Sequence, residues 1–194
     1  MALNVGSTTP DTLTAPLDLT LAGRTPIKLF GLATPITAAL VAADGYVVIG
    51  GSTRCCDNTA LPATTNNAWL APWWDDLQGR AGGGVYFLQT GTPGNIETII
   101  SWENWSEYPS STYTGMSLNF QIRIKPNGDV EYHYGNNTAG PGTDADALAA
   151  GSSASVWIEA ASAADIFVAR TSDATMPTVN PLVGGLAIRY RAMR

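Results

Sequence analysis

The most regular segment of the chain reads Leu118-Asn119-Phe120-Gln121-Ile122-Arg123-Ile124-Lys125-Pro126-Asn127-Gly128-Asp129-Val130-Glu131-Tyr132-His133-Tyr134. Apolar and polar residues alternate before the Pro-Asn-Gly turn and again after it. Because successive strand residues point to opposite faces, each half predicts a strand with one face on a core and the other in solvent. Asn127 and Gly128 supply the positive φ angles that a tight turn requires. The segment therefore predicts an antiparallel hairpin, with His133 on its outer face.

Similar strand-like runs recur along the chain between Gly, Pro, Asn and Asp residues. They are Ile27–Phe30, Tyr46–Ile49, Val85–Gln89, Thr98–Trp102, Met116–Ile124, Val130–Tyr134, Ser155–Glu159, Ile166–Arg170 and Leu186–Tyr190. The one helical candidate is Thr143–Ala150, for which a loop is an equally good interpretation. The pattern predicts an all-β chain: one two-sheet antiparallel β-sandwich over residues 1–194, jelly-roll-like, with long loops.

The first residues, 1–16, are expected to form an extended N-terminal arm that lies across a neighbouring molecule. The segment is rich in Thr and Pro, and it has neither the basic start nor the apolar stretch of a secretory signal. If Met1 is the native start, the protein is made without the usual export signal. A domain cut from a longer secreted chain would begin in the same way.

Composition excludes several classes of partner. Sixteen acidic residues against ten basic ones give a net charge of -6. Without a basic surface, binding to nucleic acid or to an anionic membrane loses its main driving force. No apolar run approaches the roughly 20 residues of a membrane-spanning helix, so membrane insertion is not expected. The abundance of Thr, Gly, Ser and Asn is typical of secreted and virion proteins.

The two cysteines, Cys55 and Cys56, are adjacent. A disulfide between neighbours is strained, and two cysteines with one histidine do not complete a standard zinc site. Two free thiols are the simpler interpretation, and an intermolecular disulfide or a metal contact is the alternative.

Paired carboxylates beside tryptophans, in Trp73-Trp74-Asp75-Asp76, invite a hypothesis of sugar hydrolysis. That chemistry needs two carboxyl groups facing one bond, whereas adjacent strand residues point to opposite faces. A structural role for Trp73, Trp74 and Asp75 is the better interpretation, with an aspartate accepting backbone N–H bonds from the Gly-rich turn that follows. A bound cation and catalysis are the alternatives.

A second aromatic cluster follows the strand that ends at Trp102. We expect Trp102 in the core, and Trp105 and Tyr108 nearer a rim, where they and Asp76 would be candidate ligand contacts. Asp144 and Asp146 lie in a Gly/Pro-rich loop and are weak calcium candidates, with solvated loop charge as the alternative. No other cofactor is expected.

The order of the sequence blocks resembles the extracellular domain named after nidogen, in a bacterial or phage version. The similar blocks span residues 44–159: Asp44–Gly50, Ala71–Leu77, Gly84–Phe87, Ile99–Trp105, Leu118–Ile122, Gly128–Gly135 and Gly151–Glu159. The resemblance implies a β-rich domain of matrix or cell-surface proteins that is associated with adhesion and not with catalysis. It supplies no catalytic residues.

Together these observations predict a non-enzymatic structural or binding protein. The leading hypothesis is a virion surface component, such as a phage capsid decoration or accessory protein, with protein partners and self-association as a trimer. The alternative is a bacterial cell-surface adhesion or carbohydrate-binding module that takes a glycan. These hypotheses place the chain on the virion surface or at an extracellular cell surface.

Overall fold

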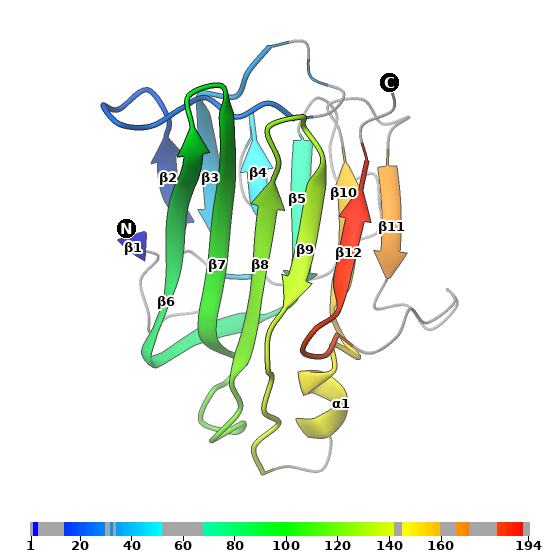
Figure 1. The fold of residues 1–194 in the computed structure, drawn as a ribbon. Coiled ribbons are helices and arrows are strands. Elements are labelled where there is room, and N and C mark those ends of the chain that lie inside the picture. The colour runs from blue at the N-terminus through cyan, green and yellow to red at the C-terminus, as the bar shows by residue number, and fades with distance from the viewer. Residues whose placement is uncertain are drawn as a thin grey trace.

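A computed structural model describes residues 2–3, 14–29, 32, 34–51, 68–141, 145–159, 166–170 and 182–191. The predicted all-β, two-sheet antiparallel sandwich is confirmed: two six-stranded sheets lie face to face (Figure 1). In order across the sheet, sheet A contains β1 (Ala2–Leu3), β6 (Leu77–Thr92), β7 (Asn95–Glu107), β8 (Leu118–Ile124), β9 (Val130–Tyr134) and β12 (Ala187–Tyr190). Sheet B contains β11 (Ile166–Arg170), β10 (Ser155–Glu159), β5 (Ala68–Trp74), β4 (Val47–Ile49), β3 (Ala38–Ala42) and β2 (Thr14–Asp18).

The predicted hairpin is formed by β8 and β9, whose residues alternate between buried and half-buried along both strands. The amide of Lys125 donates to the carbonyl of Asp129 at 2.8 Å and closes the loop. Gly128 has a φ of 89°, and the Asn127 side chain accepts the amide of Asp129 at 3.1 Å. The hairpin loop therefore depends on both residues that the sequence singled out.

Replacing Gly128 with alanine is expected to lower the free energy of unfolding by about 1 kcal/mol, because a Cβ is strained at this positive φ. Urea denaturation of Gly128→Ala measures the loss. The exposed Gly94→Ala in the β6–β7 turn has a similar φ of 83° and open space around it, and should cost about the same. Equal stability of Gly128→Ala and the wild type would contradict this account of the turn.

Some strands differ from the sequence-based prediction, and the alternative left open at Thr143–Ala150 is resolved as a helix. The prediction of a strand over Ile27–Phe30 is wrong for the described residues 27–29, where Ile27 forms one isolated bridge with Ile36. Each of these two residues follows a proline, which has no N–H for a ladder. The Ala-rich β3 was not predicted, since alanine is a weak strand former. Within Thr143–Ala150, a short helix, α1 (Ala145–Ala149), is formed.

The described parts of the N-terminal arm belong to this chain's own sheets. β1 pairs with β6 at Tyr86 and Val85, and β2 pairs with β3 over its whole length. Residues 2–3 and 14–16, which were expected to extend toward a neighbour, therefore form edge strands of the sandwich. The rest of the arm lies outside the described residues.

The main core fills the space between the sheets, and four side chains of sheet A cross it to bond the backbone of sheet B or of the turn between β3 and β4. The indole N–H groups of Trp102 and Trp105 donate to the carbonyls of Ala42 and Ala43, both at 2.9 Å. The hydroxyls of Tyr132 and Tyr134 donate to the carbonyls of Trp157 and Pro72, at 2.9 and 2.8 Å. These bonds fix how the sheets are placed against each other.

A second apolar cluster lies on the outer side of sheet B. It contains Ala42, Tyr46, Val48, Trp69, Ala71, Trp74 and Trp157. Their side chains are at most 2% exposed, and every residue of β5 and β10 is buried. Both faces of sheet B are therefore covered at these strands, unlike the one-sided burial of β8 and β9. Among the described helices, none is long and apolar enough to cross a membrane.

Candidate binding face

Of the two tryptophans on β7, Trp102 lies where the sequence predicts it and Trp105 does not. Trp102 is fully buried, as expected. Trp105 is fully buried too, and its indole N–H reaches across to sheet B. The expected rim position of Trp105 is therefore wrong: a register shift between Trp102 and Trp105 where β7 pairs with β8 breaks the simple alternation. A buried indole does not contact a ligand at the surface.

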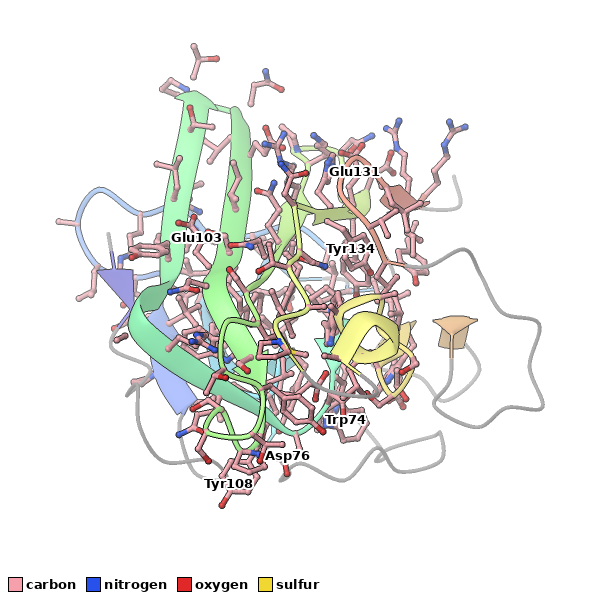
Figure 2. The ribbon with its side chains drawn as sticks, turned by 90° about the horizontal axis from the view of Figure 1, so that it is seen from below. Trp74, Asp76, Glu103, Tyr108, Glu131 and Tyr134 are labelled. Carbon is pink, nitrogen blue, oxygen red and sulfur yellow. The ribbon has the colours of Figure 1, made fainter. Side chains whose placement is uncertain are left out.

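Tyr108 and Asp76 lie together at the edge where β5 passes into β6 (Figure 2). The amide of Tyr108 donates to the carbonyl of Asp76 at 2.9 Å, and the Tyr108 side chain is 43% exposed. Trp73 and Trp74 are fully buried, in line with a structural role for the tryptophans. Of the three predicted contacts, Tyr108 is thus the exposed one and Asp76 is partly buried.

Glu107 and Asp75 form a buried acidic pair next to this edge, with side chains only 5% and 8% exposed. One Asp75 oxygen accepts the amide of Asp76, the next residue, at 3.0 Å. The expected bond was to the more distant Gly-rich turn. Desolvation, reinforced by the negative charge of Asp75, raises the pKa of Glu107 to about 9. Glu107 is therefore protonated near neutral pH. Both side chains are buried away from a substrate at the surface, and Glu107 can hold a proton there.

The calcium candidates fall mostly outside the described part of the chain. Asp144 is not described, and Asp146 lies in α1, where its side chain is not described. Cys55 and Cys56 are also outside the described residues. Within the described ranges, no three His, Cys, Asp or Glu side chains come together as a metal site.

The outer face of sheet A carries a network of charges on β7, β8, β9 and β12. Lys125 contacts Glu97 at 2.7 Å and Glu131 at 3.1 Å, and Glu131 also contacts His133 at 2.9 Å. Arg189 on β12 contacts Asp129 at 2.8 Å. Partial burial raises the pKa of Glu131, but its hydrogen bonds with His133 and Lys125 outweigh that effect and hold the pKa below its usual value. This network fixes the side chains at one end of the face.

Beside the network, a hollow of about 230 Å³ opens on the same face. Its polar side chains are Ser101 and Glu103 on β7, Asn119 and Gln121 on β8, and His133 on β9. Ser101, Gln121 and His133 lie directly opposite one another across three strands. Gly135 adds no side chain, and this leaves the hollow open at its end. We call this site the sheet A hollow.

Asn119 shapes the hollow and is not available to a ligand. Its side-chain oxygen accepts the amide of Asn104 at 3.0 Å, and its nitrogen donates to the carbonyl of Asn136 at 2.9 Å. Asn104 has a φ of 56°, a left-handed conformation that this bond helps to hold. A Cβ at Gly135 would stand 3.0 Å from the Asn119 Cβ, so a larger residue there would crowd the wall.

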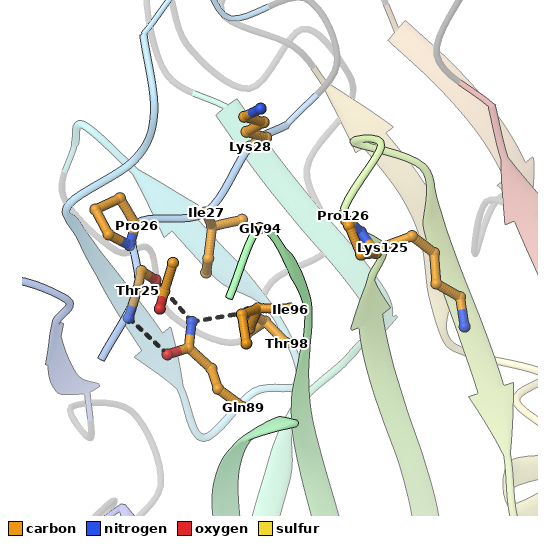
Figure 3. Close-up of a pocket in the computed structure, with 10 residues that line it drawn as sticks. All are labelled: Thr25, Pro26, Ile27, Lys28, Gln89, Gly94, Ile96, Thr98, Lys125 and Pro126. Atoms are coloured by element: carbon orange, nitrogen blue, oxygen red, sulfur yellow. Dashed lines mark hydrogen bonds between the residues drawn. The ribbon is translucent and has the colours of Figure 1, made fainter. Parts of the chain in front are cut away.

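A smaller cavity of about 100 Å³ lies under residues 25–28, which cross the edge of the β6–β7 hairpin (Figure 3). Gln89 holds this segment: its amide nitrogen donates to the Thr25 carbonyl at 2.7 Å, and its oxygen accepts the Thr25 amide at 2.8 Å. Lys28 and Lys125 border the cavity but extend away from Gln89. Lys125 is engaged by Glu97 and Glu131. This cavity is thus a packing feature of the segment.

Sequence reasoning missed the sheet A hollow, although part of the signal was present. The alternation in 118–134 correctly placed Gln121 and His133 on an outer face. The missing information was the register of β7 against β8, which sets Ser101 opposite Gln121. The long sequence separation of these strands hides that register from a local pattern.

A family model described as NIDO related matches residues 26–188, most of the chain. Neither a curated protein nor a solved structure gives a significant match. Domains of this kind are extracellular and generally non-catalytic. The matched range includes the two sheets except their N-terminal edge strands and the end of β12. The chain therefore belongs to the NIDO-related family.

Proposed function

We propose that this chain is a non-enzymatic binding module of an external surface and that it contacts its target with the outer face of sheet A. The contrast between the two outer faces carries this proposal. The outer face of sheet B is buried at β4, β5 and β10, where its aromatic cluster lies. The outer face of sheet A instead keeps ordered polar and charged side chains at the surface, with a hollow among them. Ordered polar groups at a concave site suit recognition.

Two matched variants test which face binds. Ala187 on β12 is exposed and lies directly opposite His133, and Ala38 on β3 is exposed on sheet B. Ala187→Arg and Ala38→Arg add the same bulk and charge to exposed strand positions. Using fluorescently labelled protein, we expect Ala187→Arg to lose at least tenfold in binding to intact cells or virus particles of the source, while Ala38→Arg binds like the wild type. Equal binding by both variants, or loss only in Ala38→Arg, would rule out the face.

The second part of this proposal concerns the surface that carries the chain, a virus particle or a cell envelope. We infer display on a virus particle, where the chain would act as a capsid decoration or accessory protein and associate with copies of itself; its composition is typical of secreted and virion proteins. The alternative is an adhesion module on a bacterial cell envelope. Immunogold electron microscopy with antibody against this chain separates the two. Regular labelling of particles is the expected result, and labelling confined to the envelope would reject the virion assignment.

A further inference from the structure

We propose that the sheet A hollow binds a single sugar ring of a glycan, an inference that rests on the proposed binding function and names its ligand class. The hollow offers three polar groups with unused hydrogen-bonding atoms. Within the described part of the chain, the side-chain amide of Gln121 has no hydrogen-bond partner. Glu103 uses one carboxylate oxygen, which accepts from the Ser101 hydroxyl at 3.1 Å. His133 uses Nε2, which contacts Glu131.

This set of groups selects hydroxyl-bearing ligands. A hydroxyl donates one hydrogen bond and accepts others, so neighbouring hydroxyls match a carboxylate, an amide and an imidazole placed side by side. An anion would meet the Glu103 carboxylate, and an apolar ligand would leave all three groups without partners, at a cost in free energy. Pockets for drug-sized ligands measure about 300–1,000 Å³. The hollow, at about 230 Å³, is smaller and suits one ring.

An aromatic side chain lies on β6, the strand next to the hollow. Tyr86 on β6 lies opposite Ser101, on the same face. A Cβ placed on Gly84 would meet the Tyr86 hydroxyl at 3.0 Å and the adjoining ring carbon at 3.1 Å, so the ring lies over Gly84. Gly84 in turn lies opposite Glu103. The ring and the carboxylate are therefore neighbours, and the apolar face of a sugar can pack on the ring while its hydroxyls reach the polar groups.

Two of the three polar groups, Glu103 and His133, are held in place before any ligand binds. Ser101 orients Glu103, and Glu131 orients His133 while itself held by Lys125. Asn119 fixes the wall between them through its bonds to Asn104 and Asn136. Groups that are already ordered lose little conformational entropy on binding, which favours affinity for a small ligand.

The test is a titration of ¹⁵N-labelled full chain with the methyl glycosides of glucose, galactose, mannose and N-acetylglucosamine, followed by NMR. We expect at least one glycoside to bind with a Kd of about 1 mM and to shift the amides of residues 101–103, 119–121 and 133–135. Gln121→Leu should weaken this binding at least tenfold. Thr90→Val removes a polar group from the exposed far end of β6 at similar size and should bind like the wild type.

The inference is overturned if none of the four glycosides shifts these amides, or if Gln121→Leu folds and binds as tightly as the wild type. Its failure is separable from failure of the proposed function. Without glycoside binding, a selective loss in Ala187→Arg would keep the binding face and reject the sugar. If a glycoside binds but Ala187→Arg and Ala38→Arg bind equally well to cells or virus particles of the source, the sugar site is kept and the face is rejected as the point of attachment.

Discussion

Replacing Glu107 with glutamine is expected to stabilise the protein at pH 8 and to leave its stability at pH 4.5 nearly unchanged. Glu107 ionises near pH 4.5 in the unfolded chain and near pH 9 in the folded one. Between these values the folded state holds a proton that the unfolded state has released. The free energy of unfolding therefore falls as pH rises through this window, by at most about 1.4 kcal/mol per pH unit. The stabilisation is complete below pH 4.5 and is lost by about pH 9.

Glutamine keeps the shape of the protonated acid and carries no charge at any pH, so it removes this dependence of stability on pH. We expect the free energy of unfolding of Glu107→Gln to be higher than that of the wild type by on the order of 3 kcal/mol at pH 8. Urea denaturation at pH 5 and pH 8 measures the difference. Glu103→Gln, an exposed change on the same strand, is the matched control and should give a far smaller pH-dependent difference. A constant difference between Glu107→Gln and the wild type at both pH values would show that Glu107 is not buried as a neutral acid.

Truncating Trp105 to alanine is expected to lower the free energy of unfolding by about 3–5 kcal/mol, because it empties a fully buried site between the sheets. Trp105→Phe retains much of the volume but leaves the Ala43 carbonyl without its donor, at a cost of about 1–3 kcal/mol. For a chain of this size, the alanine variant should melt roughly 10 °C or more below the wild type.

Tyr108→Ala is the matched control, since it removes an aromatic side chain from the exposed edge. We expect it to change stability by no more than about 0.5 kcal/mol. Differential scanning calorimetry on the three variants gives the ranking. If Trp105→Ala cost no more than Tyr108→Ala, Trp105 would lie at the surface, as the sequence alone suggested.

Local patterns in the sequence predicted the parts of the fold that depend on neighbouring residues. The alternation and the Asn127-Gly128 turn gave the β8–β9 hairpin with its inner and outer faces, and Ser155–Glu159 and Ile166–Arg170 have the bounds expected for them. The fold class follows from such strands, because they have one apolar face each and must bury it against a second sheet.

The parts that depend on distant contacts were not predictable in this way. The burial of Trp105 follows from a register shift between β7 and β8 and from the Ala43 carbonyl just after β3, which lies 62 residues earlier in the sequence. The covered outer face of sheet B breaks the expectation that a sandwich exposes its outer faces. The sheet A hollow exists because three strands meet in one register, and no single segment encodes that meeting.

The central claim is that the outer face of sheet A is the contact surface. Hydrogen–deuterium exchange of the chain, measured with and without intact cells or virus particles of the source, tests it most directly. We predict slower exchange in peptides that cover residues 119–135 on bound protein, with no change in peptides that cover residues 38–42 of β3. Protection at residues 14–18 and 38–42, with none at 119–135, would contradict the account.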